Sequence, residues 1–158
     1  MANPGRVRRQ LIGVANPKVA ELMVTTLRTH GSTRAWVVNG GGLDELTTTD
    51  RTLVIDIVDG EVSRREIDPA DVGLERRTVD DIAVGDPAAN AEVARRVLGG
   101  ELSAHRDIVV LNAAAGLVVA DIAGDLADGV ILAAAAIDDG RAAATLDRLV
   151  AASNASND

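Results

Sequence analysis

Two adjacent carboxylates, Asp44 and Glu45, are the residues whose type and placement point most directly to chemistry in this chain. They follow a glycine run at 40–42, which itself follows the apolar stretch 35–38 (Ala-Trp-Val-Val). This order predicts a buried strand that ends in an acidic turn. Carboxylates on a loop can converge on one region of solvent, where a hard divalent cation prefers oxygen ligands. The segment therefore predicts a site for Mg²⁺ and phosphate.

The same residues also admit simpler structural interpretations. Asp44 can cap a short helical turn with Glu45 in its first turn, where negative charge is favoured. Gly41 and Gly42 either let the backbone approach a substrate closely or provide a turn with positive φ. The spacing of the residues leaves both alternatives open.

The elements before the acidic pair form a recognisable unit. Residues 10–15 (Gln-Leu-Ile-Gly-Val-Ala) predict a short buried strand, and Asn16-Pro17 then supplies an N-cap and a first-turn proline. Apolar residues recur at helical spacing up to Gly31, before the strand at 35–38. A strand, helix, strand order favours a parallel pair, and open sheets of this kind bind ligands at the carboxyl ends of their strands. The acidic pair follows such an end.

The rest of the chain completes an α/β pattern. Asp59-Gly60 separates two strand-like runs, 52–58 and 61–67, and predicts a hairpin. Asp86-Pro87 begins an amphipathic helix that stops at Gly99-Gly100. We therefore predict an α/β domain over residues 1–152, with a mixed, largely parallel sheet flanked by helices, and a disordered polar tail at 153–158. The remaining expected elements are a buried segment at 108–111 and helices at 113–119, 129–137 and 142–151.

Composition excludes several classes of protein. The chain has 158 residues with one Trp, no Phe and no Tyr, so aliphatic side chains must fill its core. A net charge of -8 makes nucleic acid and anionic membranes poor partners. The absence of Cys excludes disulfides and thiol nucleophiles. The longest apolar stretch, 130–137, is too short to span a bilayer, and no signal-peptide pattern is present, so we expect a cytoplasmic protein.

Several blocks, taken in order, resemble the carboxyl-terminal half of anthranilate phosphoribosyltransferases, in the glycosyltransferase family shared with pyrimidine nucleoside phosphorylases. The resemblance covers nearly the whole chain, from residue 3 to about residue 149. The blocks that carry it are 11–14 (Leu-Ile-Gly-Val), 42–46 (Gly-Leu-Asp-Glu-Leu), 85–91 (Gly-Asp-Pro-Ala-Ala-Asn-Ala), 97–100 (Val-Leu-Gly-Gly) and 106–114 (Arg-Asp-Ile-Val-Val-Leu-Asn-Ala-Ala).

This resemblance implies a reaction and a site. Enzymes of this kind transfer phosphoribosyl from phosphoribosyl pyrophosphate to anthranilate in tryptophan biosynthesis, with Mg²⁺ as cofactor. The acidic pair of their Gly-Leu-Asp-Glu motif coordinates the Mg²⁺, so the resemblance gives that role to Asp44 and Glu45. It implies a partial phosphoribosyltransferase domain, with Gly41 and Gly42 as candidate substrate contacts. Catalysis would then rest on positioning and electrostatics, without a histidine base.

The chain also departs from the family pattern. The family's Gly-Thr-Gly-Gly-Asp pyrophosphate loop does not occur here, and neither does the histidine that precedes the glycines of the acidic motif. We therefore expect a portion of such an enzyme, with either a missing amino-terminal half or self-association covering its exposed apolar surface. The alternative is a non-catalytic α/β module that completes a composite site with a separate chain. A phosphorylase is disfavoured because no phosphate-binding lysine or serine signature is visible.

The other polar residues that stand out receive structural assignments. His30 and His105 are expected at surface or helix-end positions rather than in catalysis. Asn112 is interpreted as a hydrogen-bonded structural amide rather than a ligand, and Asn90 likewise. The arginines near the amino terminus are interpreted as solvated; they are Arg6, Arg8 and Arg9.

Overall fold

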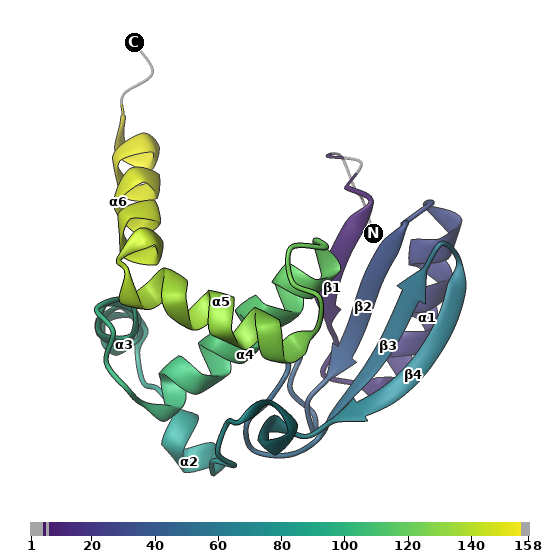
Figure 1. Ribbon diagram of the computed structural model, residues 1–158, viewed down its shortest axis with the longest axis horizontal. Helices are drawn as coiled ribbons and strands as arrows, with labels where there is room; N and C mark the ends of the chain where they lie inside the picture. The colour runs from purple at the N-terminus through teal and green to yellow at the C-terminus, as the bar shows by residue number, and fades with distance from the viewer. Residues whose placement is uncertain (1–4, 6, 156–158) are drawn as a thin grey trace.

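The computed structural model describes residues 5 and 7–155 (Figure 1). A small sheet is packed between one helix on one face and a group of helices on the other. The elements in chain order are β1 (Arg9–Gly13), α1 (Pro17–Thr29), β2 (Arg34–Asn39), β3 (Thr52–Val58), β4 (Glu61–Ile67), the 3₁₀ helix η1 (Pro69–Val72), α2 (Val79–Ile82), α3 (Pro87–Leu98), α4 (Ala104–Val119), α5 (Leu126–Asp138) and α6 (Arg141–Asn154).

The four strands pair in the order β1-β2-β3-β4. β1 and β2 are parallel, joined by the α1 crossover, whereas the β2–β3 and β3–β4 pairs are antiparallel. The prediction of an α/β fold with a mixed sheet flanked by helices is confirmed. The prediction that the sheet is largely parallel is wrong: parallel pairing is confined to β1 and β2, because the loop after β2 and the Asp59-Gly60 hairpin each reverse the chain.

The alternation of side chains along the strands divides the core into two layers. Ala35 and Val37 of β2 face α1, where they pack with Val24 and Leu27. Trp36 and Val38 face the other way, into a larger cluster formed with α4 and the start of α5. Because successive strand residues point to opposite faces, one buried strand contributes to both layers. The central strands are therefore apolar on both sides, as the sequence suggests.

The helices beyond the sheet form a second packed group. α4 and α5 are the most closely packed helix pair, and Val97 of α3 joins them in a third cluster with Val110, Ala133 and Ile137. α6 lies at the far end of this group from the sheet, and none of its side chains is buried (Figure 1). None of the helices described is long and apolar enough to cross a membrane.

Side chains placed just before the helices determine where they begin. Asn16, Asp86, Ser103 and Asp125 each accept a hydrogen bond from a backbone N–H of the following first turn. The Ser103 cap starts α4 well before the helix expected from residue 113, so the buried segment at 108–111 is helical. The ends of α1 and α3 agree with those predicted.

The carboxyl end differs from the expected tail. α6 continues to Asn154, so Ser153 and Asn154 belong to the helix, where both side chains bond to the Val150 carbonyl oxygen. The rest of the predicted tail, at 156–158, lies outside the described residues.

The contact between α4 and α5 yields a test of packing. A Cβ on Gly129 would stand 2.8 Å from the Ala114 carbonyl oxygen and 2.9 Å from the Ala114 Cβ. We expect Gly129→Ala to lower the free energy of unfolding by about 1–3 kcal/mol, because the helices would have to separate. Gly116→Ala is the matched control, since nothing lies within 4 Å of its added Cβ. It should stabilise α4 by up to about 1 kcal/mol. Urea unfolding followed by Trp36 fluorescence measures both, and equal effects would contradict the proposed contact.

Candidate functional site

The chain turns sharply at the carboxyl end of β2. Gly40 and Leu43 exchange two backbone hydrogen bonds of 3.0 and 3.1 Å, which close a turn around Gly41 and Gly42. These two glycines have φ values of 63° and 101°, in the region that other residues rarely adopt. The interpretation of both glycines as turn residues with positive φ is confirmed. Their role as substrate contacts stays a prediction.

Two further glycines allow the acidic segment to lie directly on the strand ends. A Cβ on Gly13, the last residue of β1, would stand 1.4 Å from the Asp44 carbonyl oxygen. A Cβ on Gly40 would stand 2.4 Å from the Glu45 carbonyl oxygen. The backbone of the acidic pair therefore occupies space that any side chain at these glycines would fill. The pair is placed at the carboxyl ends of the parallel strands, where ligands bind in open α/β sheets.

Asn112 of α4 holds the residue that follows the acidic pair. Its Oδ1 accepts from the Leu46 N–H at 2.9 Å, and its Nδ2 donates to the Leu46 carbonyl oxygen at 2.8 Å. Nδ2 also donates to Ile108 at 3.0 Å and lies 3.4 Å from Glu45 Oε2. The interpretation of Asn112 as a hydrogen-bonded structural amide is confirmed. Its contact with Glu45 also makes it a positioning residue of the site.

Both carboxylates of the pair are exposed, and no helix begins at Asp44, so the alternative of a helix cap is wrong. Among the described residues neither carboxylate has an ion-pair partner, although most nearby acids do. Partial burial, and then the adjacent Asp44 carboxylate, raise the pKa of Glu45. Two like charges held close together repel each other, and a bound divalent cation would offset this repulsion.

The pair alone is an incomplete metal site. No group of three or more potential acidic, histidine or cysteine ligands occurs within the described part of the chain. Mg²⁺ typically takes one or two carboxylates, keeps several water molecules and binds substrate phosphates. The residues present therefore fit a cation that arrives together with a phosphate-bearing ligand.

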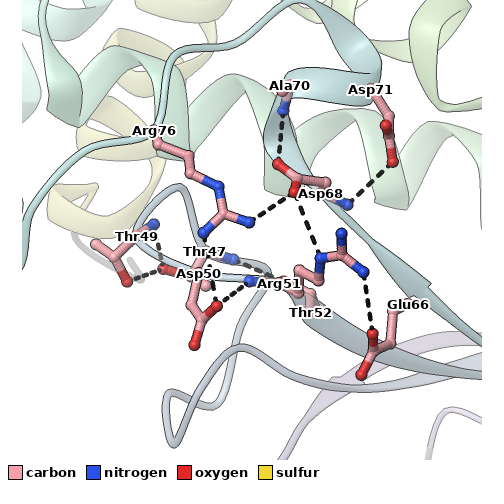
Figure 2. Close-up of polar contacts among 10 residues, drawn as sticks. All are labelled: Thr47, Thr49, Asp50, Arg51, Thr52, Glu66, Asp68, Ala70, Asp71 and Arg76. Atoms are coloured by element: carbon pink, nitrogen blue, oxygen red, sulfur yellow. Dashed lines mark hydrogen bonds and ion pairs between the residues drawn. The ribbon is translucent and has the colours of Figure 1, made fainter.

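The loop after the acidic pair is anchored by polar contacts on two sides. On one side the Arg77 N–H donates to the Thr48 carbonyl oxygen at 2.9 Å, while the Arg77 guanidinium bonds to Asp107 of α4 at 2.7 Å. On the other side Figure 2 shows Arg51 and Arg76 converging on Asp68. These contacts fix the loop between α4 and the turn after β4.

Asp68 is the centre of the second anchor. Arg76 donates to its Oδ2 at 2.6 Å, and this bond is the main cause that lowers the pKa of Asp68. The other carboxylate oxygen accepts from the Ala70 N–H at the start of η1. Arg76 also forms an ion pair with Asp50, at 3.7 Å. Because Asp68 caps η1, Arg76 links the loop after the acidic pair to that helix.

The remaining candidate residues have structural positions. His30 ends α1 and contacts the Thr26 carbonyl oxygen, and His105 lies in the first turn of α4, as expected of helix-end residues. Asn90 is exposed on α3. Arg8 and Arg9 are exposed, as expected of solvated arginines, and Arg9 also forms a surface ion pair with Asp121. Arg6 lies outside the described residues.

Sequence comparison identifies the family. The profile described as "Glycosyl transferase family, a/b domain" matches residues 1–143. The chain belongs to this family. The curated members most similar to it include the anthranilate phosphoribosyltransferases of Methylorubrum populi, 54% identical over 156 residues, and Methylocella silvestris, 50% identical over 155 residues. Each alignment covers 98% of this chain and 46% or 44% of the relative.

Solved structures of family members agree with the fold. The crystal structure of anthranilate phosphoribosyltransferase from Thermus thermophilus superposes with a TM-score of 0.80 at 34% identity, over 88% of this chain and 41% of that chain. A Saccharomyces cerevisiae enzyme in complex with PRPP and Mg has the same TM-score at 23% identity, and at that identity supports the fold alone. The resemblance deduced from the motifs is confirmed. The chain spans a little less than half the length of its curated relatives.

Sequence reasoning located the acidic pair but not its supports. It did not connect Gly13, Asn112 or Arg77 with the loop that carries the pair. A glycine at the last position of a predicted strand is a signal of close backbone approach, and could have drawn attention to Gly13. No local pattern links Asn112 to Leu46, because the contact joins segments 66 residues apart.

The raised pKa of Glu45 makes a prediction about pH. Because folding raises this pKa, the cost to stability begins as the pH rises past the ordinary value of 4.5, where the carboxyl of the unfolded chain ionises, and is complete above the folded pKa. Glu45→Gln should therefore match the parent chain well below the ordinary value of 4.5. Above the folded pKa it should be slightly more stable, by less than about 0.5 kcal/mol because the group is exposed. Thermal unfolding from pH 3.5 to 7.5 tests this, and a variant less stable at neutral pH would contradict it.

A second variant tests the support of the loop. Asn112→Ala would leave both backbone groups of Leu46 without their partner, and should cost about 2 kcal/mol or more of unfolding free energy. Asn90→Ala removes the same amide from an exposed helical position and should change stability by less than about 0.5 kcal/mol. Chemical unfolding of both variants provides the comparison. Similar small losses would show that the Leu46 contacts contribute little.

Proposed function

We propose that this chain provides the Mg²⁺-binding part of a site that transfers phosphoribosyl from phosphoribosyl pyrophosphate to anthranilate. The observation that carries the proposal is the unpaired Asp44-Glu45 couple at the carboxyl ends of β1 and β2. The names of its relatives, anthranilate phosphoribosyltransferases, supply the reaction. Tryptophan biosynthesis would be the metabolic setting.

The chain's own residues have limited, specific tasks in this proposal. Asp44 and Glu45 hold the cation through carboxylate oxygens, while Asn112 fixes the backbone that follows them. Gly41 and Gly42 carry no side chain, so a phosphate-bearing ligand can come close to the turn. Bound Mg²⁺ would neutralise the charge that develops on the departing pyrophosphate.

A second form of the proposal is favoured by the extent of the alignments. The relatives are more than twice as long as the part that this chain matches. The chain would then act as a module that binds Mg²⁺ and phosphoribosyl pyrophosphate and completes a composite site with a separate chain. Both forms give the acidic pair the same role, so one set of variants tests them together.

The test combines a binding and a turnover measurement. Binding of Mg²⁺ and phosphoribosyl pyrophosphate is followed by the amide NMR signals of Gly41 and Gly42, and turnover by the loss of anthranilate fluorescence. We expect Asp44→Asn and Glu45→Gln to abolish the ligand-induced shifts. If the chain turns over, these variants should lower kcat by about a hundredfold or more, because they remove groups that stabilise developing charge.

Asp80→Asn is the matched control, since it removes one exposed negative charge from α2. It should leave binding and turnover unchanged. Turnover that is lost only in the Asp44 and Glu45 variants would support the enzyme. Binding without turnover would support the composite module. Absence of binding, or equal losses in all three variants, would refute both forms.

A further inference from the structure

The last residue of β2, Asn39, bonds to the segment that follows β1. Its Nδ2 donates to the Val14 carbonyl oxygen at 2.6 Å and to the Ala15 carbonyl oxygen at 3.1 Å. An amide nitrogen carries two hydrogens, so each of them can serve one of these carbonyl groups. Asn39 is 7% exposed, and both bonds are therefore made inside the molecule. The side chain ties the end of β2 to the turn between β1 and α1.

The ladder between β1 and β2 indicates what the bond to Val14 replaces. In a parallel pair, a residue that faces the neighbouring strand donates its N–H to one residue there and accepts at its carbonyl oxygen from the residue two positions further on. At the start of the pair the Arg34 N–H donates to the Arg8 carbonyl oxygen, and at its end the Val14 N–H donates to the Val38 carbonyl oxygen. The same register would pair the Val14 carbonyl oxygen with the Gly40 N–H.

The Gly40 N–H does not make that ladder bond. It donates instead to the Leu43 carbonyl oxygen at 3.0 Å, and this bond closes the glycine turn before the acidic pair. Val14 is buried, so its carbonyl oxygen requires another partner, and the Asn39 amide supplies it. A side-chain donor thus completes the ladder at the point where the backbone leaves it.

The segment that Asn39 holds is also the one on which Asp44 rests. Asn39 shares with Val37 the face of the sheet that α1 covers. Gly13 shares with Leu11 the opposite face, towards α4. On that face the Asp44 carbonyl oxygen occupies the place of a Cβ on Gly13. The end of β1 therefore lies between the Asn39 side chain and the Asp44 backbone.

We propose that Asn39 is a positioning residue for the acidic pair, because it supplies the ladder donor that Gly40 gives up. Without its amide, the Val14 carbonyl oxygen competes with that of Leu43 for the Gly40 N–H, and the glycine turn opens. Asn39 supports the chain before the acidic pair, as Asn112 supports it afterwards.

Hydrogen-bond scalar couplings in the NMR spectrum of the ligand-free chain test this exchange of partners. The parent chain should show a coupling between the Gly40 nitrogen and the Leu43 carbonyl carbon. In Asn39→Ala we expect this coupling to weaken by about half or more, and a coupling to the Val14 carbonyl carbon to appear, because two acceptors then share one donor. An unchanged Gly40–Leu43 coupling would overturn the proposal.

Val37→Ala is the matched control, because it removes buried atoms from the same face of β2 and leaves every donor in place. It should destabilise the chain without changing the Gly40–Leu43 coupling. If the coupling weakens equally in this control, general destabilisation is the cause and the proposal is wrong. Asn39→Ser keeps one hydroxyl donor and takes the place of Asn39→Ala if the latter does not fold, with a smaller change of the same kind expected.

A binding measurement connects Asn39 with the proposed function, on which the inference rests for this step alone. We expect Asn39→Ala to raise the Kd for phosphoribosyl pyrophosphate with Mg²⁺ about tenfold or more, and Val37→Ala to change it less than about twofold, because only the first loosens the preorganised turn. An unchanged Kd in folded Asn39→Ala would refute the positioning role. A parent chain that does not bind would refute the proposed function instead, while the couplings still decide whether Asn39 holds the turn.

Discussion

The absence of a side chain at Gly13 is the constraint on which the site depends. The Asp44 carbonyl oxygen lies 1.4 Å from where a Cβ at that position would stand, so the acidic segment and the end of β1 share the same space. Gly40 permits a similar approach to the Glu45 carbonyl oxygen. Backbone packed this closely cannot shift toward the sheet, and Asn112 restrains Leu46 from the side of α4. The carboxylates are therefore held mainly by their backbone, with Asn112 Nδ2 at 3.4 Å from Glu45 Oε2 as an additional side-chain contact.

This arrangement explains the distribution of charge around the site. Asp68 and Asp107 are paired with arginines and hold the loop in place. Asp44 and Glu45 have no such partner within the described chain and remain exposed. Paired carboxylates serve the structure because an arginine offsets their charge, whereas an unpaired couple costs stability unless something cationic binds. The paired acids, Asp68 and Asp107, therefore stabilise the loop, whereas Asp44 and Glu45 remain available to bind a cation.

Sequence reasoning was most successful where the signal is local. The Asn16-Pro17 and Asp86-Pro87 caps and the Asp59-Gly60 hairpin were predicted because each depends on a few neighbouring residues. The start of α4 was misplaced, since the apolar run from Ile108 to Leu111 has no periodicity that separates a strand from a buried helix. The supports of the acidic pair were missed for a different reason. They join β1, α4 and the segment after η1, and local patterns carry no information on such pairings.

A polar cluster that Trp36 forms with Asp56 and Arg65 was also invisible from sequence, and its origin lies in the antiparallel half of the sheet. The β2–β3 register places Trp36 opposite Asp56, and β4 then adds Arg65 beside both. In a fully parallel sheet strands are typically buried on both faces and apolar throughout, so such a cluster would be costly. Here β4 is an edge strand with exposed Arg64, Arg65 and Glu66, and polar groups can reach inward from it. The same chain reversal that limits parallel pairing to β1 and β2 thus creates a polar environment at the opposite end of β2 from the acidic pair.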